Sequence, residues 1–209
     1  MNISELNVTD ICNYRYYFLD TNIWIFYLKY IQGDVDSTAD NYISFIERIV
    51  GHNESIALLP AKVKKKSVNI KFVMTGNLLS EILNTSLREI CMKNFFGKSY
   101  IQMNFKNDYR NNVKSDYSVQ LNILKDDIKA YSEHIESFSD NFDKKSYKEY
   151  LDLLNENSDF NDAMFIEFVK EHNLENPDNK ICIITHDSDF YFEDIPIQTC
   201  NKKLLRHSK

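Results

Sequence analysis

The sequence predicts an α/β fold with a mostly parallel sheet that is covered by helices on both faces. Short apolar runs, which are typical of buried parallel strands, alternate along the chain with longer segments that carry apolar residues at helical spacing. Glycine (4 residues) and proline (3 residues) are scarce, which disfavours an all-β fold with many tight turns. Of the 209 residues, 43% are hydrophobic, which is enough for a substantial core.

The N-terminal part of the chain is expected to contain one core strand and two helices. Residues 16–19 form an apolar run that ends in Asp20, as a buried strand would. The apolar segment 23–31 is expected to be a helix with Asn22 as its N-cap. A second helix is expected over residues 37–50, ending at the glycine that follows.

A second strand over residues 69–74 and a helix that ends at about Cys91 are expected next. Thr75 or Asn77 is the expected N-cap of this helix, whose apolar stripe begins at Leu78. The mixed stretch before the strand is compatible with either a loop or an irregular hairpin.

Residues 94–156 are more polar than the segments on either side and are expected to form a helical insertion. Seven apolar residues recur there at steps of three and four, which predicts an amphipathic helix: Tyr117, Leu121, Leu124, Ile128, Tyr131, Ile135 and Phe138. Another helix is expected over residues 146–154. We therefore predict a single domain whose core comprises residues 15–93 and 157–206.

The C-terminal part of the chain is expected to supply a helix and the last two strands. The helix covers residues 159–172, and the run 180–185 has the clearest pattern of a buried strand. A short strand over residues 195–199 and a terminal turn of helix over 201–206 complete the prediction. Strands that alternate with helices in this way favour a parallel sheet.

Charge and cysteine content narrow the class of protein. The formal net charge of −6 disfavours a broad basic surface, so contact with RNA or DNA would use local patches or bridging metal ions. The four cysteines form no CxxC pair, which disfavours a zinc cluster: Cys12, Cys91, Cys182 and Cys200. The chain opens with no signal-peptide pattern and has no apolar run of membrane-spanning length, so we expect a cytoplasmic protein without membrane contact.

Four acidic residues occupy positions that a parallel sheet can bring together. Asp20 and Asp187 each follow a predicted strand, and ligands of open parallel sheets bind beyond the carboxyl ends of the strands. Either residue can instead be a turn or cap residue. Helical spacing puts Asp162 within the apolar arc of its helix, where it can also bind free amides at the helix start. Glu81 lies at the edge of an apolar stripe and by itself reads as a solvated residue.

Four carboxylates that converged on one crevice would repel one another unless cations neutralised them. Mg²⁺ and Mn²⁺ suit such a site, because these hard ions prefer carboxylate ligands and retain several waters. An ion held there can polarise a phosphodiester and activate a water. The sequence contains no phosphate-binding loop, serine triad or catalytic cysteine pair that would compete for this role.

Five motifs occur in an order and strand context that resemble those of a known family. They are Tyr-Phe-Leu-Asp-Thr-Asn-Ile, Thr-Gly-Asn-Leu-Leu-Ser-Glu-Ile-Leu, Asn-Asp-Ala-Met-Phe-Ile, Ile-Ile-Thr-His-Asp-Ser-Asp-Phe and Ile-Gln-Thr-Cys-Asn-Lys-Lys-Leu-Leu. Together they resemble the PIN-domain ribonucleases, the family that includes the VapC toxins, over residues 15–93 and 157–206. The long insertion and the bulky residues after Asp162 depart from the family pattern.

The resemblance implies a Rossmann-like three-layer α/β/α sandwich and a Mg²⁺- or Mn²⁺-dependent endoribonuclease. It implies that Asp20, Glu81, Asp162 and Asp187 form the metal-binding and catalytic tetrad. The resemblance also implies supporting roles for four further residues: Asn22, Thr185, Asp159 and Asp189. RNA or single-stranded DNA would be the substrate, and a toxin of this kind would have a small antitoxin partner and would form a homodimer.

The densest basic run is a candidate for the substrate backbone, namely Lys62, Lys64, Lys65 and Lys66. The same run also reads as a solvated loop. Trp24, Tyr27 and Tyr30 lie at helical spacing and can be base-stacking residues, core residues or part of a dimer interface.

Two other functions are compatible with the residues. A catalytically silent PIN-like module would bind RNA or a protein partner, with the helical insertion as its docking surface. A phosphatase or phosphotransferase would use Asp20 as its nucleophile, but the Asp-x-Asp pattern of that chemistry has Asn22 at its second position here.

Overall fold

A computed structural model describes the chain over residues 3–34, 36–64, 67–140, 144–153, 160–188, 190 and 194–206. Four residues that the sequence pointed to as supporting or substrate-binding lie outside these ranges: Asp159, Asp189, Lys65 and Lys66.

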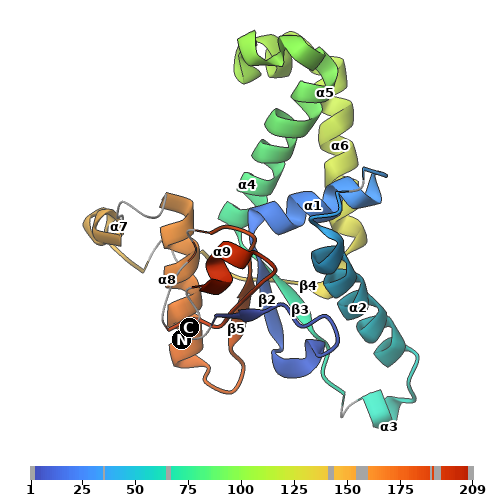
Figure 1. The fold of residues 1–209 in the computed structure, drawn as a ribbon, viewed down its shortest axis with the longest axis vertical. Coiled ribbons are helices and arrows are strands. Elements are labelled where there is room, and N and C mark those ends of the chain that lie inside the picture. The colour runs from blue at the N-terminus through green and yellow to red at the C-terminus, as the bar shows by residue number, and fades with distance from the viewer. Residues whose placement is uncertain are drawn as a thin grey trace.

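The described residues form one six-stranded sheet in which all strands are parallel, whereas the sequence predicted a mostly parallel sheet and did not reveal β1 or β4 (Figure 1). The strand order is β1-β6-β5-β2-β3-β4. The strands are β1 (Ile3–Glu5), β2 (Tyr16–Leu19), β3 (Lys71–Met74), β4 (Ile135–Ser137), β5 (Ile181–Ile184) and β6 (Ile197–Thr199).

The two central strands are the two that the apolar runs identified most clearly. Every residue of β2 and β5 is buried, and the strands pair in register from Tyr16 opposite Ile181 to Leu19 opposite Ile184. A strand buried on both faces needs apolar side chains at successive positions, which is why these runs do not alternate with polar residues.

Helices cover both faces of the sheet, so the chain forms a three-layer α/β/α arrangement. Its longer helices are α1 (Thr21–Ile31), α2 (Asp40–Ala57), α4 (Gly76–Thr85), α6 (Lys114–Ala130) and α8 (Phe160–Glu175). The shorter helices are α3 (Ala61–Lys64), α5 (Lys93–Phe96), α7 (Tyr147–Leu153) and α9 (Lys202–Leu205). None of the helices in the described ranges has the length and apolar character needed to cross a membrane.

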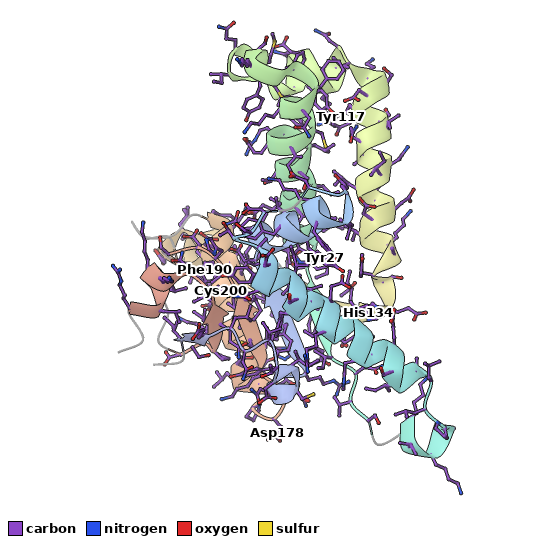
Figure 2. The ribbon with its side chains drawn as sticks, turned by 45° about the vertical axis from the view of Figure 1, so that its right-hand side comes forward. Tyr27, Tyr117, His134, Asp178, Phe190 and Cys200 are labelled. Atoms are coloured by element: carbon purple, nitrogen blue, oxygen red, sulfur yellow. The ribbon has the colours of Figure 1, made fainter. Side chains whose placement is uncertain are left out.

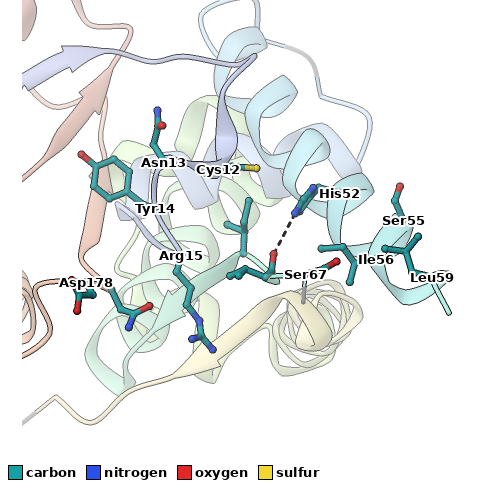
Figure 3. Close-up of a pocket in the computed structure, with 13 residues that line it drawn as sticks. Cys12, Asn13, Tyr14, Arg15, His52, Ser55, Ile56, Leu59, Ser67 and Asp178 are labelled. Atoms are coloured by element: carbon teal, nitrogen blue, oxygen red, sulfur yellow. Dashed lines mark hydrogen bonds between the residues drawn. The ribbon is translucent and has the colours of Figure 1, made fainter. Parts of the chain in front are cut away.

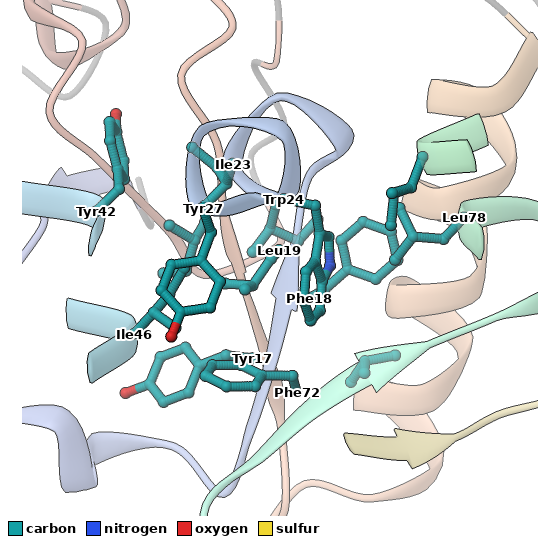
Figure 4. Close-up of a cluster of buried hydrophobic side chains, with 14 of the residues drawn as sticks. Tyr17, Phe18, Leu19, Ile23, Trp24, Tyr27, Tyr42, Ile46, Phe72 and Leu78 are labelled. Carbon is teal, nitrogen blue, oxygen red and sulfur yellow. The ribbon is translucent and has the colours of Figure 1, made fainter. Parts of the chain in front are cut away.

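Successive residues of β2 show the two faces. The Tyr17 ring meets Phe45 of α2 with ring centroids 5.0 Å apart, and the Phe18 ring meets Phe165 of α8 at the same separation. Trp24 of α1 packs edge-on against Phe72 of β3 on the Tyr17 face (Figure 4). Each of these side chains is almost completely buried, so the apolar periodicity of the helices and the apolar runs of the strands serve one core.

The strand order reverses direction between β2 and β5. From β2 the chain builds β3 and β4 on one side, and from β5 it builds β6 on the other. In open parallel sheets this reversal leaves a crevice at the carboxyl ends of the two central strands, because the connections on either side lead away from it.

The helix boundaries show which local signals were reliable. Thr75 is the N-cap of α4, and its hydroxyl accepts a hydrogen bond from the Leu78 amide at 3.2 Å. The expected Asn22 cap is wrong, because α1 starts directly after Asp20 and Asn22 is an exposed residue of its first turn. The expected end of α2 before Gly51 is also wrong, since this helix continues to Ala57.

The expected helical insertion over residues 94–156 needs a correction. Residues 135–137 form β4, which pairs with β3 from Phe72 opposite Ile135 to Met74 opposite Ser137. The predicted amphipathic helix therefore ends at Ala130, and Ile135 and Phe138 belong to the sheet edge. A three-residue edge strand carries too few positions to show an alternating pattern, and its apolar residues happen to continue the helical spacing.

A helical arm projects from the core (Figures 1 and 2). The helix α4 continues through a π-helix, η2 (Ser86–Met92), into α5, and α6 returns beside it. The short turns η3 (Gly97–Gln102) and η4 (Phe105–Asn111) connect them, starting at Gly97, whose φ of +55° favours glycine. Tyr109 is fully buried at the tip, and its hydroxyl donates to Asp116 at 2.6 Å.

Two buried asparagines attach helices to the starts of the strands that follow them. Asn53 of α2 donates to the Ile70 carbonyl at 2.7 Å and accepts from the Ile70 amide at 2.9 Å. Asn173 of α8 makes the same pair of bonds to Ile181, at 3.0 Å and 2.6 Å. Each asparagine side chain thus satisfies the amide and carbonyl of one backbone residue at the amino end of the sheet, as a neighbouring strand would.

We predict that Asn53→Ala and Asn173→Ala each lower the free energy of unfolding by about 1–3 kcal/mol, because each leaves a buried amide and carbonyl without partners. The measurement is urea denaturation. The exposed Asn84→Ala in α4 is the control and should change stability by less than about 0.5 kcal/mol. A loss no larger than that of the control would contradict the role assigned to these two amides.

Candidate functional site

A buried carboxylate lies at the carboxyl ends of β2 and β5, where open parallel sheets bind their ligands. Asp20 directly follows β2, and only 5% of its surface is exposed. Its backbone amide donates to the Ile184 carbonyl at 3.0 Å, which continues the pairing of β2 with β5 by one residue. Its Oδ2 atom accepts a hydrogen bond from the Thr185 hydroxyl at 2.9 Å.

Thr185 connects the two acids that follow the central strands. Its Oγ1 atom donates to Asp20 and accepts from the Asp187 amide at 3.0 Å. Because this one buried hydroxyl makes both hydrogen bonds, it orients the Asp20 carboxylate and also the backbone that carries Asp187.

Burial raises the pKa of Asp20 from its ordinary value to about 7. The negative charges of Glu81 and Asp187 raise this pKa further, whereas the hydrogen bonds from Thr185 and from the Thr21 amide lower it. Glu81 and Asp187 are both half-buried, and Oε2 of Glu81 is withdrawn from solvent. The carboxyl groups of Asp20, Glu81 and Asp187 thus influence one another where little water reaches them.

Asp162 lies in the first turn of α8 and is half-buried. Figure 1 places the start of this helix at the same edge of the sheet as the ends of β2 and β5. Asp162 is not among the described groups whose charges act most strongly on Asp20. The structure therefore brings Asp20, Glu81 and Asp187 within electrostatic reach of one another and puts Asp162 at the same edge of the sheet.

Tyr42 is a supporting residue that the sequence did not reveal. This α2 residue is fully buried; its hydroxyl accepts from the Cys200 amide at 2.8 Å and lies 3.2 Å from the Thr185 carbonyl. The same hydroxyl lies 3.1 Å from Nδ1 of His186. Tyr42 thereby ties α2 to the segment between β5 and Asp187, but in the sequence it reads as one more apolar position of a helix.

Asp140, which follows β4, is a second supporting residue that the sequence did not reveal. Its carboxylate accepts hydrogen bonds from the Asn77 amide, the shorter at 3.1 Å, at the start of the helix that carries Glu81. A Cβ atom on Gly76 would come within 2.8 Å of its Oδ2 atom, so the glycine leaves room for this contact. The acid also complements the positive end of the α4 dipole.

The aromatic residues of α1 lie in two settings. Trp24 and Tyr27 are core residues with about 1% of their surface exposed, and both appear inside the apolar cluster of Figure 4. Tyr30 is exposed and stacks on Tyr27. Two of the three candidate stacking residues are thus inaccessible to a base.

The fit of a divalent cation to the site is mixed. Within the described ranges, no three His, Cys, Asp or Glu side chains lie close enough together to hold a metal ion. Mg²⁺, however, is usually held by one or two carboxylates and keeps several of its waters. The chemistry of the donors also fits, because a cation beside Asp20 would stabilise the ionised form of a carboxyl group whose pKa is raised by burial and by neighbouring negative charges.

The basic residues Lys62 and Lys64 lie in α3, which precedes β3 and sits beyond the amino end of the sheet (Figure 1). Next to this helix is a pocket of about 690 Å³ whose lining includes Arg15, His52 and Ile56 (Figure 3). Both features are at the end of the sheet opposite to Asp20. The two lysines are therefore not placed to hold a phosphate at the acidic crevice.

Comparisons of this chain with protein-family models, with curated proteins and with solved structures found no match.

We predict that Asp20→Asn changes how stability depends on pH in metal-free buffer. The folded pKa is raised, so between pH 4 and 7 the unfolded wild type releases a proton that the folded protein keeps, and its stability falls as pH rises. Relative to wild type, the variant should therefore gain roughly 1–3 kcal/mol between pH 5 and pH 8. Chemical denaturation at both pH values measures this, with the exposed Asp178→Asn as control. Parallel pH profiles for Asp20→Asn and wild type would show that the carboxyl group is not perturbed.

Proposed function

We propose that this chain is a divalent-metal-dependent nuclease that hydrolyses phosphodiester bonds of RNA at the crevice beside Asp20. The observation that carries the proposal is the buried Asp20 carboxyl, whose pKa is raised to about 7 at the reversal point of the sheet while two other carboxyl groups face it. Carboxyl groups gathered in this way favour a bound cation over an empty site.

Asp20 and Asp187, which follow the adjacent strands β2 and β5, would hold Mg²⁺ or Mn²⁺. Glu81 of α4 or Asp162 of α8 would complete the set of ligands. A bound ion would supply charge stabilisation at the phosphate and a lowered pKa for the attacking water. Glu81 of α4 acts electrostatically on Asp20, and outside the metal shell it would be the residue that accepts the proton of that water.

Thr185 and Tyr42 would act as positioning residues. The Thr185 hydroxyl orients the Asp20 carboxylate and favours its ionised form, which is the form that binds a cation. Tyr42 holds the carbonyl of Thr185 and the ring of His186 in place from the other layer. Neither side chain contacts the reacting phosphate in this proposal.

The motif resemblance to PIN-domain ribonucleases gives independent support, because Asp20, Glu81, Asp162 and Asp187 occupy the acidic positions of that family. The toxin role, the antitoxin partner and the homodimer rest on that resemblance alone.

The test is cleavage of a fluorescently labelled single-stranded RNA with Mn²⁺, and of a single-stranded DNA of the same sequence. We predict that Asp20→Asn and Asp187→Asn each reduce the rate by about 100-fold or more, because each removes a metal-binding oxygen. Asp178→Asn makes the same chemical change at the opposite end of the core and should cleave like wild type (Figure 2). If all four proteins cleave at the same rate, the activity does not arise at this site.

We further predict that Thr185→Val slows cleavage by about 10- to 100-fold, because it removes the hydroxyl that orients Asp20 and keeps the shape of the side chain. Thr185→Ser retains the hydroxyl and should stay within a few-fold of wild type. The informative readout is the Mn²⁺ concentration for half-maximal rate, which should rise for the valine variant. An unchanged metal dependence in Thr185→Val would rule out its positioning role.

A catalytically silent module that binds RNA or a protein is the second candidate. It is favoured by the net charge of −6 and by the long helical insertion, which offers a docking surface. RNA binding by the wild type that Mn²⁺ neither strengthens nor converts into cleavage would support it over the nuclease.

A further inference from the structure

Positive charge is concentrated at the tip of the helical arm. We define the arm tip as residues 86–114, which carry six basic residues and two acidic ones, whereas the whole chain has a net charge of −6. The basic residues are Arg88, Lys93, Lys98, Lys106, Arg110 and Lys114; the acidic ones are Glu89 and Asp108. The arm tip thus has a net charge of +4 (six minus two), and the rest of the chain has −10 (−6 minus 4), so the tip is a local basic region on an acidic protein.

The charges of the arm tip are available to a partner. All six basic residues are exposed, and the four lysines form no ion pair with any residue in the described ranges. Arg88 pairs with Glu89, but both side chains are about half exposed, so this pair is weak. Arg110 lies over the ring of Tyr117, 5.8 Å from its centroid.

A groove lined mainly by apolar residues of η2, η3 and η4 lies among these charges. It has a volume of about 270 Å³ and is lined by Arg88, Met92, Tyr100, Ile101, Met103 and Phe105. Ile101 is 88% exposed, and Phe95 nearby on the arm is 49% exposed. Aromatic rings and a guanidinium plane beside unpaired lysines are the combination that binds unstacked bases and their phosphates.

The arm is continuous with the acidic crevice. Glu81 lies in α4, and the same run of helix reaches Arg88 seven residues later, or roughly 10 Å along the axis at the α-helical rise. The arm leaves the core at the carboxyl edge of the sheet, since α4 begins where β3 ends. A strand held on the arm would therefore lead toward the end of the sheet that contains Asp20.

We propose that the arm tip binds single-stranded RNA, with a base in the groove beside Tyr100 and the backbone along Lys93, Lys98 and Lys106. This proposal rests on the proposed function, because it makes the arm the surface that holds the substrate for the acidic crevice. It also accounts for how an acidic protein would attract a polyanion.

An anionic membrane surface is the other partner that a basic arm would suit. The groove favours RNA, because Tyr100 and Phe105 line a depression, whereas membrane-bound helices present one continuous apolar face. Phe95 and Phe96, the remaining aromatic residues of the arm tip, pack on the ring of the buried Tyr109 and so stabilise the arm.

The test measures binding of a fluorescein-labelled 20-nucleotide single-stranded RNA by anisotropy, in EDTA and in an Asp20→Asn background, so that no cleavage is needed. Lys93→Glu/Lys98→Glu/Lys106→Glu should weaken binding at least about tenfold and lower the slope of log affinity against log salt by about two. The matched control Lys62→Glu/Lys64→Glu/Lys180→Glu makes the same change in net charge at the opposite end of the core. It should weaken RNA binding by less than about threefold, because these lysines would not contact the RNA backbone. Equal losses in both triple variants, or no loss in the first, would overturn the proposal.

The groove is tested separately. Tyr100→Ala should weaken RNA binding by about 5- to 100-fold through lost stacking, whereas Tyr100→Phe keeps the ring and should bind like the parent. Equal binding by both variants would overturn the assignment of a base to the groove. Vesicles containing phosphatidylserine serve as a second probe, and arm-dependent binding to them without RNA binding would overturn the choice of partner.

Failure of this proposal is distinguishable from failure of the proposed function. Arm-dependent RNA binding by a protein that never cleaves would support the arm and overturn the nuclease. Metal-dependent cleavage would support the nuclease, and if the arm variants changed neither cleavage nor RNA binding, the role of the arm would be overturned.

Discussion

The hydrogen bond from Thr185 to Asp20 is the contact on which the rest of the site depends. It joins the ends of the two central strands at the point where the sheet order reverses, and it holds a carboxylate where burial alone would exclude one. Glu81 and Asp187 reach the same space because α4 begins at the end of the neighbouring strand and β5 pairs with β2 in register. The electrostatic strain at Asp20 is therefore a consequence of strand order rather than of any one local sequence.

The amino and carboxyl ends of the strands carry different kinds of polar contact. At the amino end, Asn53 and Asn173 fasten helices to the first residues of β3 and β5. At the carboxyl end, helices begin and polar side chains face the crevice, so the backbone amides at their starts favour negative charge there. Paired side-chain hydrogen bonds thus support the amino edge of the sheet, whereas mutually repelling carboxyl groups lie at the carboxyl edge.

The position of the arm shows why the net charge of the chain is a poor guide to what it binds. The net charge of −6, taken over the whole chain, disfavours binding to nucleic acid. The six basic residues of the projecting arm tip, however, lie apart from most of the acidic residues. The mean charge of a sequence describes solubility better than it describes binding, because a partner responds to the local field within about a Debye length, ~10 Å at moderate ionic strength.

By itself, the sequence determined the elements with strong local signals. Continuous apolar runs identified β2 and β5, the Thr75 cap marked the start of α4, and the position of Asp20 and Asp187 after strands indicated a shared edge. Tertiary structure alone decided the rest. It made residues 135–137 an edge strand, extended α2 past Gly51 and brought Tyr42 and Asp140 to the site. Local periodicity reports which face of an element is buried, whereas these outcomes depend on partners that lie far away along the chain.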